Sequence, residues 1–459
     1  MGTKVLPGDR LSDADALMWR IETDPVLRSP ILVVGELDSA PPFAAVLEAF
    51  DRTARAIPRL RQRVVSAGPL VGQLRWADDP AFDVAHHVHE RMVRRGAGFR
   101  GALDLAGEEA AAAFDPARPP WTAAIVRGLP DRRAALVLRF HHAITDGVGG
   151  IDLADRLFDP IAGGRSRPGD GPGSTDGTGT RRSGTDYIGS GLRLVRAMGS
   201  TVADPVGAVR DSLRTVRSVG RLLAPAREPL SPLLAGRGID RELHVFDVPL
   251  AAFHDAAASC ESTINDVFLG VVGGALREYH DQLGQPVRAL RFTMPVNRRT
   301  TADAPGGNRF TPVRFVLSVD ADDLAGRARE AGQVSRGWRS EPSLGFTDLL
   351  ASALNQLPDP AVTAAFAGML RSVDVDAVDV PGLTEPMALA GARVERLFAF
   401  APPTGAALSV TLLSHVELAC VALECDTAAV AEPRRLADCV AGALDEVVAL
   451  AGTHPGGTS

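Results

Sequence analysis

The chain has 459 residues, a formal net charge of −7 at pH 7 and 45% hydrophobic residues, values typical of a globular protein of roughly two or three domains. Its single lysine, Lys4, excludes classes that need a lysine in a folded pocket, namely Walker A nucleotide binders, pyridoxal Schiff-base enzymes and protein kinases. The acidic balance argues against a nucleic-acid partner, because neutralising phosphates requires a concentrated basic face.

Cysteine usage and hydropathy indicate the compartment. The four cysteines show no CxxC spacing, which argues against a disulfide framework and a zinc knuckle and fits a reducing cytoplasm. The N-terminus has no apolar signal region. The most apolar stretch, 406–423, is interrupted by polar residues and falls short of the about 20 apolar residues that span a bilayer. We therefore expect a cytoplasmic protein for which any membrane contact is peripheral.

The first part of the chain mixes helices and strands. Apolar residues at helical spacing predict a helix capped by Ser12 or Asp13 and a second helix over 43–57. Short runs of β-branched and apolar residues, bounded by Pro, Gly or Asp, predict strands at 31–35, 64–65 and 134–140.

A change in composition marks the main boundary. Residues 163–185 are almost entirely Gly, Ser, Thr, Arg, Asp and Pro, which predicts a flexible linker. An amphipathic helix with an arginine stripe follows, and two readings stay open: a bridging helix with solvated arginines, or a surface for anionic lipid head groups or cofactor phosphates. The stripe consists of Arg210, Arg214, Arg217 and Arg221. We expect an N-terminal subdomain (1–160), a linker with this helix (161–236) and a C-terminal subdomain (237–459).

The α/β alternation resumes after the linker. A clean 3.6-residue period predicts a helix capped by Ser262 or Thr263, and a last helix is expected over 433–450. The predicted strands are 291–296 and 313–319, followed by a β-hairpin formed by 407–413 and 416–424.

The strongest chemical feature is the segment 140–150, which follows a predicted strand and contains His141, His142, Asp146 and several glycines. Strand alternation places the two imidazoles on opposite faces, which disfavours a shared metal and favours one working and one packing or orienting histidine. A histidine is suited to general-base catalysis near neutral pH. For Asp146 the favoured role is a turn carboxylate that holds an arginine or backbone amides, rather than direct proton transfer. No G-x-S-x-G elbow occurs.

A second group of histidines lies at His86, His87 and His89. Alternation would put His87 and His89 on one side of a strand and His86 on the other, so we do not favour a metal site there.

The segment from His141 to Gly147 resembles the HHxxxDG motif of the CoA-dependent acyltransferase superfamily, which includes chloramphenicol acetyltransferases and condensation domains. Within it, the chain resembles the bacterial wax ester synthase/diacylglycerol acyltransferase family over nearly its whole length. The segments that resemble family motifs, in chain order, are 11–16 (LSDADA), 58–63 (PRLRQR), 118–121 (RPPW), 265–267 (NDV), 273–277 (GGALR), 294–299 (MPVNRR), 307–308 (GN) and 389–394 (LAGARV). Two departures are Pro120, where the family has Leu, and Val378-Asp379, where it has Ser-Asn.

The resemblance implies an α/β fold with mixed sheets, built as two chloramphenicol-acetyltransferase-like subdomains with the active site in a channel between them. It implies acyl-CoA as co-substrate, no permanently bound cofactor or metal, and an alcohol or diacylglycerol as acceptor. His142 would deprotonate the acceptor hydroxyl, with His141 and Gly147 as further members of the motif. Asn265 would assist at the oxyanion, or act as a capping amide; Arg298 and Arg299 would hold Asp146 or a CoA phosphate, or be solvated loop residues.

Two other functions stay open. Val378 and Asp379 suggest a diverged relative that acylates a specialised metabolite from CoA or a carrier-protein thioester. A non-catalytic lipid-binding protein would require a vestigial histidine site.

Overall fold

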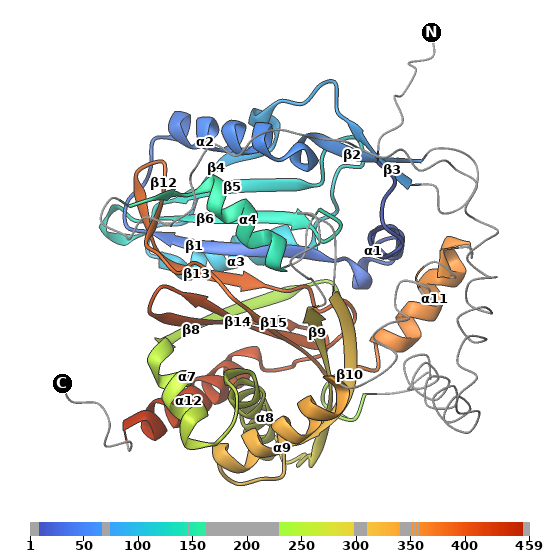
Figure 1. Ribbon diagram of the computed structural model, residues 1–459, viewed down its shortest axis with the longest axis vertical. Coiled ribbons are helices and arrows are strands. Elements are labelled where there is room, and N and C mark those ends of the chain that lie inside the picture. Colours follow the sequence, from blue (N-terminus) through green and yellow to red (C-terminus); the bar gives the residue numbers. More distant parts are fainter. Residues whose placement is uncertain are drawn as a thin grey trace, which may run out of the picture.

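Two stacked sheets with helices on their outer faces form the body of the protein, as the computed structural model shows (Figure 1). The structure describes residues 9–66, 74–144, 147–161, 229–297, 310–339, 351, 354–355 and 358–452. The predicted linker segment 163–185 and the arginine stripe from Arg210 to Arg221 lie outside these ranges.

The first sheet carries the histidine pair and has seven strands in the order β4-β5-β6-β1-β13-β12-β7. Its strands are β1 (Pro30–Leu37), β4 (Val88–Met92), β5 (Trp121–Arg127), β6 (Ala134–His141), β7 (Asp159–Pro160), β12 (Met387–Leu389) and β13 (Ala392–Phe400). Only β4 and β5 pair in parallel; the other neighbours are antiparallel. Two strands near the end of the chain, β12 and β13, thus complete a sheet that begins near its start.

The second sheet has six strands in the order β10-β9-β11-β14-β15-β8. Its strands are β8 (Arg241–Pro249), β9 (Ala289–Asn297), β10 (Phe310–Ser318), β11 (Val375–Val380), β14 (Leu408–His415) and β15 (Leu418–Asp426). β11 runs parallel to β9 and β14, so both main sheets are mixed. The predicted hairpin is confirmed as the antiparallel pair β14 and β15. A small third sheet pairs β2 (Gln62–Ser66) with β3 (Leu74–Asp78).

The predicted helices that fall within the described ranges are confirmed, and capping side chains mark the start of two of them. The helices are α1 (Asp13–Ile21), α2 (Phe43–Ala56), α3 (Gly98–Ala111), α4 (Gly147–Leu157), α7 (Leu250–Ser259), α8 (Ile264–Gln282), α9 (Leu324–Arg339), α11 (Asp359–Leu370) and α12 (Pro433–Gly452), with short 3-10 turns η1 (Pro25–Leu27), η2 (Pro58–Arg61), η3 (Val84–His86) and η4 (Pro130–Arg132). Ser12 caps α1 by accepting the Asp15 N–H. Thr263 caps α8 in a reciprocal capping box with Asp266, which satisfies N–H groups that the helix itself leaves free.

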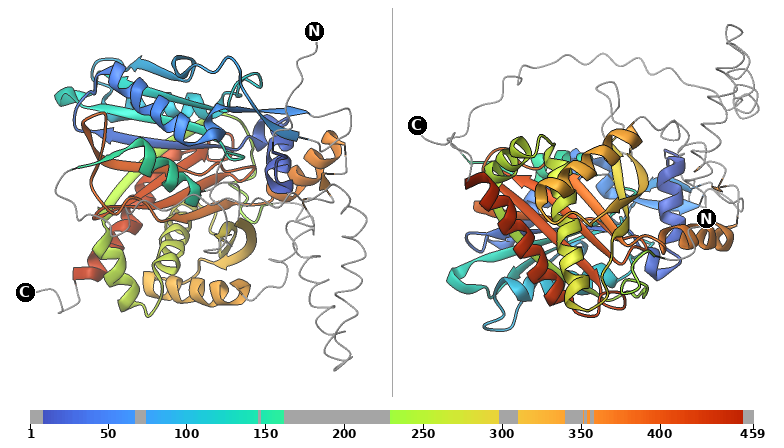
Figure 2. Two further views of the ribbon diagram at one scale, coloured as in Figure 1. Left: turned by 45° about the horizontal axis from the view of Figure 1, so that its top comes forward. Right: turned by 90° about the horizontal axis from the view of Figure 1, so that it is seen from below.

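The core is layered. α2 and α4 cover one face of the first sheet, and the other face packs on α3 and on β8 and β15 of the second sheet. Helices α7, α8, α9 and α12 cover the outer face of the second sheet, as the view from below shows (Figure 2). α9 approaches α8 closely at Gly274, where an added Cβ would lie 2.7 Å from the Arg327 guanidinium, so close helix packing explains this glycine.

Within the described ranges, every helix is too short or too polar to cross a bilayer.

Candidate active site

The two histidines lie where β6 ends. His141 is the last residue of the strand, His142 begins the following turn, and α4 starts at Gly147. This confirms the predicted strand end. Asp146 lies outside the described part of the chain.

His141 is fully buried and held in one orientation. Its ring packs against Trp19 and Phe114, with centroid distances of 4.9 and 6.0 Å. Its Nδ1 accepts the Ala143 N–H at 2.9 Å, which requires an unprotonated Nδ1 and places the proton of a neutral ring on Nε2. Phe114 also lies beneath the Arg139 guanidinium at 3.8 Å, so His141 and Arg139 share one face of β6, as strand alternation predicts.

A glutamate faces this Nε2. The Glu22 Oε1 atom lies 3.1 Å from His141 Nε2, but the N–H points off the line between the two atoms, so we treat the pair as an electrostatic contact rather than a linear hydrogen bond. The same Oε1 accepts the Ser29 N–H at 2.9 Å. Desolvation alone would raise the pKa of Glu22; His141, the Ser29 amide and the Arg139 charge outweigh it and lower that pKa. Glu22 is therefore a half-buried, ionised anchor.

The Glu22 network reaches His142 through one residue. The Ser29 carbonyl oxygen accepts the His142 N–H at 3.2 Å, while the Ser29 N–H binds Glu22. In contrast to His141, the His142 side chain is only half-buried. One histidine is thus locked in the core by its neighbours, and the next is anchored by its backbone with a side chain that solvent can reach.

Asn265 and Asp266 lie in the first turn of α8. Asp266 is buried, and its Oδ2 accepts the Thr263 N–H and hydroxyl, at 3.1 and 2.8 Å. Because Thr263 and Asp266 form the cap, the half-buried Asn265 amide is not the N-cap of this helix. Arg298 and Arg299 lie outside the described residues.

The departure at Val378 and Asp379 lies at the end of β11. The following residues, Val380 and Leu383, belong to the same extended apolar cluster as Ala143. The Asp379 side chain reaches solvent, and desolvation by the surrounding protein raises its pKa to about 6.

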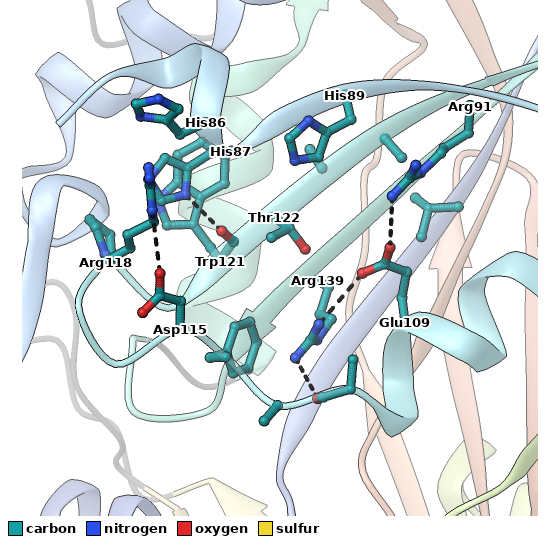
Figure 3. A pocket seen from close by; sticks show the side chains of 17 residues that line it. His86, His87, His89, Arg91, Glu109, Asp115, Arg118, Trp121, Thr122 and Arg139 are labelled. Atoms are coloured by element: carbon teal, nitrogen blue, oxygen red, sulfur yellow. Dashed lines mark hydrogen bonds and ion pairs between the residues drawn. The ribbon is translucent and has the colours of Figure 1, made fainter.

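A cavity of about 310 Å³ lies on the His141 side of the first sheet (Figure 3). The predicted separation of His86 from His87 and His89 is wrong, since all three line this cavity. The physical reason is that His86 ends the 3-10 turn η3 and β4 begins only at Val88, so strand alternation does not apply there. Among the described residues, no group of three His, Cys, Asp or Glu side chains has the arrangement of a metal site.

Sequence reasoning missed Glu22 and Ser29. Glu22 follows the last apolar position of the first predicted helix, so a helical pattern gives it no special weight. Its partners are 7 and 119 residues further along the chain, and only the fold brings them together.

Comparison with known proteins adds independent information. Residues 11–268 match the model of the wax ester synthase/diacylglycerol acyltransferase catalytic domain, and residues 306–447 match that of the WS/DGAT C-terminal domain. A Mycobacterium tuberculosis protein described as a putative diacylglycerol O-acyltransferase is 34% identical, over 97% of this chain and 92% of its own length. A second, a probable diacylglycerol O-acyltransferase of the same species, is 26% identical over 94% of each chain.

Two solved structures share the fold. The wax ester synthase/diacylglycerol acyltransferase from Marinobacter aquaeolei VT8 has a TM-score of 0.64 and 19% identity, covering 97% of this chain and 100% of that one. The first condensation domain of the calcium-dependent antibiotic synthetase has a TM-score of 0.60 and 18% identity, covering 96% of each chain.

Proposed function

The chain belongs to the wax ester synthase/diacylglycerol acyltransferase family, and on that premise we propose that it transfers a fatty acyl group from acyl-CoA to the hydroxyl of diacylglycerol or a long-chain alcohol. It is an acyltransferase that forms neutral lipids. The products are a triacylglycerol or a wax ester, and free CoA.

In the proposed reaction His142 is the general base. It takes the acceptor's hydroxyl proton as the oxygen attacks the thioester carbonyl carbon, which gives a tetrahedral intermediate. Collapse of that intermediate breaks the carbon–sulfur bond, and the leaving thiolate takes the proton from the His142 imidazolium. Asn265 is proposed to donate to the oxyanion. Asp146 and Gly147 would shape the turn, and Arg298 and Arg299 would bind a CoA phosphate or Asp146.

The observation that carries the assignment to His142 is the asymmetry of the histidine pair. A general base must reach its substrate and change protonation state in each cycle. His141 is enclosed by aromatic rings and has its Nδ1 occupied by the Ala143 N–H. His142 is half-buried, and its backbone is tied to Ser29. We therefore assign proton transfer to His142 and positioning to His141.

Asp379 favours a second candidate acceptor. A carboxyl group with a pKa of about 6 is mostly ionised at neutral pH, and a charge is unfavourable in a pocket lined for alkyl chains. A polar or amine-bearing specialised metabolite, acylated from CoA or a carrier-protein thioester, would fit such a group better.

The test is an acceptor panel. Purified protein is incubated with a long-chain acyl-CoA and diacylglycerol, a long-chain alcohol or an amino alcohol, while free thiol and product mass are followed. His142→Ala should lower the rate by about 10²–10⁴-fold. His254→Ala, an exposed histidine on α7, is the matched control. Full activity of His142→Ala would refute the mechanism, and absence of thiol release with every acceptor would refute the function.

For localisation we propose a cytoplasmic protein that contacts the inner membrane or lipid inclusions peripherally, because its acceptors are water-insoluble. Co-sedimentation with vesicles that contain diacylglycerol tests this, and recovery of all the protein in the supernatant would contradict it.

A further inference from the structure

The cavity beside β4, β5 and β6 belongs to none of the roles above. We propose that it is a binding site for a phosphate monoester, separate from the proposed chemistry at His142. The argument rests on which side chains converge on the cavity, on their charge balance and on one buried donor (Figure 3).

The cavity lies over the face of β4–β6 that also carries His141. Thr122 and Arg139 form part of its floor, and the segment 112–119 that leaves α3 borders it. His87 closes one end: its ring stacks on Trp121 with centroids 4.5 Å apart, and its Nδ1–H donates to the Trp121 carbonyl oxygen at 2.8 Å. This end is therefore rigid and already formed.

Cationic groups outnumber carboxylates around the cavity. Three arginines, Arg91, Arg118 and Arg139, line it together with three histidines, against two acids, Glu109 and Asp115. The three arginine–carboxylate separations are long: 3.9 Å for Arg91 to Glu109, 3.5 Å for Arg139 to Glu109 and 3.4 Å for Arg118 to Asp115. The lining therefore contains one more arginine than carboxylate. Glu22 lies outside the lining and also acts on the Arg139 charge, so the attraction for an anion comes mainly from Arg91 and Arg118, whose ion pairs are long.

The Arg139 guanidinium is the buried component of the site. Its side chain is 4% exposed, its Nη2 donates to the Ala112 carbonyl at 2.7 Å, and its Nε–H has no acceptor among the described residues. A buried donor without a partner is unfavourable by about 1–3 kcal/mol, so its persistence points to a ligand. Desolvation by burial also lowers the pKa of this arginine, which an adjacent anion would oppose.

Size and chemistry select the ligand class. Convergent guanidinium forks, a threonine hydroxyl and imidazoles are the groups that bind phosphoryl oxygens, and a dianion uses more than one cation. About 310 Å³ is at the lower end of ligand pockets, which suits a phosphoryl group on a small stem better than a lipid chain. The phosphate could be free or part of a larger molecule, such as the 3′-phosphate of CoA.

The experiment is calorimetric titration of the full chain with inorganic phosphate, using Arg91→Gln and Arg118→Gln singly and together. Both arginines are at least 40% exposed, so these variants should fold. Each substitution should raise the Kd on the order of tenfold, the effect of one charge-assisted hydrogen bond. The control is Arg52→Gln. Arg52 is an exposed arginine of α2, which covers the other face of the sheet, and it pairs with Asp159. This variant should bind phosphate like the unaltered chain.

Competition identifies the source of the phosphate. If CoA displaces phosphate and 3′-dephospho-CoA does not, the site exists and binds the 3′-phosphate of CoA. If neither compound displaces phosphate, the site binds a separate phosphate ligand. The proposal is overturned if phosphate shows no saturable binding, or if the double variant binds it as tightly as the unaltered chain. Acyl transfer does not enter this readout, so the outcome is independent of the proposed function.

Discussion

Removing the Glu22 carboxylate should weaken both the fold and the proposed catalysis. In Glu22→Ala the Ser29 N–H loses its acceptor, and His141 loses the carboxylate that faces its Nε2. The lost hydrogen bond of the buried Ser29 amide predicts that the free energy of unfolding falls by about 1–3 kcal/mol. Glu22→Gln keeps an acceptor oxygen and loses only the charge, so it should cost roughly 1 kcal/mol.

The effect on catalysis should follow from geometry. Ser29 holds the His142 backbone, so a shift of Ser29 moves the proposed base, and misplacement by about 1 Å can slow an enzyme about 10²-fold. We expect kcat to fall by ten- to a hundredfold in Glu22→Ala, with KM nearly constant, and by much less in Glu22→Gln. Urea unfolding followed by tryptophan fluorescence gives the stability, and thiol release gives kcat.

The pH dependence supplies a further check. Because folding lowers the pKa of Glu22, its stabilising contribution is present above the unfolded value of 4.5 and is lost as the pH falls through the folded pKa. The stability difference between the unaltered chain and Glu22→Gln should therefore vanish in acid. Asp51→Asn, which removes an exposed ion pair with Arg55, is the control and should change stability by about 0–1 kcal/mol. Unchanged stability and unchanged kcat in Glu22→Ala would refute the reasoning.

Three further predictions concern the second sheet and the loop that follows β11. Burial raises the pKa of Asp376 from 3.8 to about 7, so the folded state binds more protons than the unfolded state between these values. The free energy of unfolding should therefore fall as the pH rises from 4 to 7. Asp376→Asn should flatten this slope in urea titrations, and an unchanged slope would contradict the prediction. Glu424 carries a similar shift to about 7 and should retain part of the slope in that variant. Asp379→Asn should remove a step near pH 6 from the kcat/KM profile and favour apolar acceptors; identical profiles would exclude Asp379 from the acceptor site. Gly382→Ala would place a Cβ 1.8 Å from the Ser414 carbonyl oxygen, so thermal unfolding should report a loss of about 3 kcal/mol or more, and a stable variant would show that this loop can shift.

Elements defined by nearby residues could be predicted from the sequence. The α8 helix is an example, because its capping residue Thr263 and its apolar period lie within one segment. The end of β6 at the histidines is another, since one strand and one turn define it. The family resemblance also extended over both matched regions, and the comparisons confirm it.

Contacts between distant segments could not be predicted in this way. β13 was not among the predicted strands, and nothing in its sequence assigns it to β1. Glu22 is one of many carboxylates until the fold places it beside His141. His86 was misplaced because it ends a 3-10 turn that precedes β4, so the alternation of a strand does not apply to it.

The position of β13 in the first sheet constrains the order in which the protein folds during synthesis. β1 lies between β6 and β13, so until residue 400 has been made, one edge of β1 has no partner and exposes its hydrogen-bonding groups. Pairing of β1 with β13, which are more than 350 residues apart in the chain, is slow because the entropic cost of closing the loop comes before the strand contacts form. The sheet that carries the histidines is therefore completed late, and the nascent N-terminal half should depend on chaperones to keep that edge from aggregating.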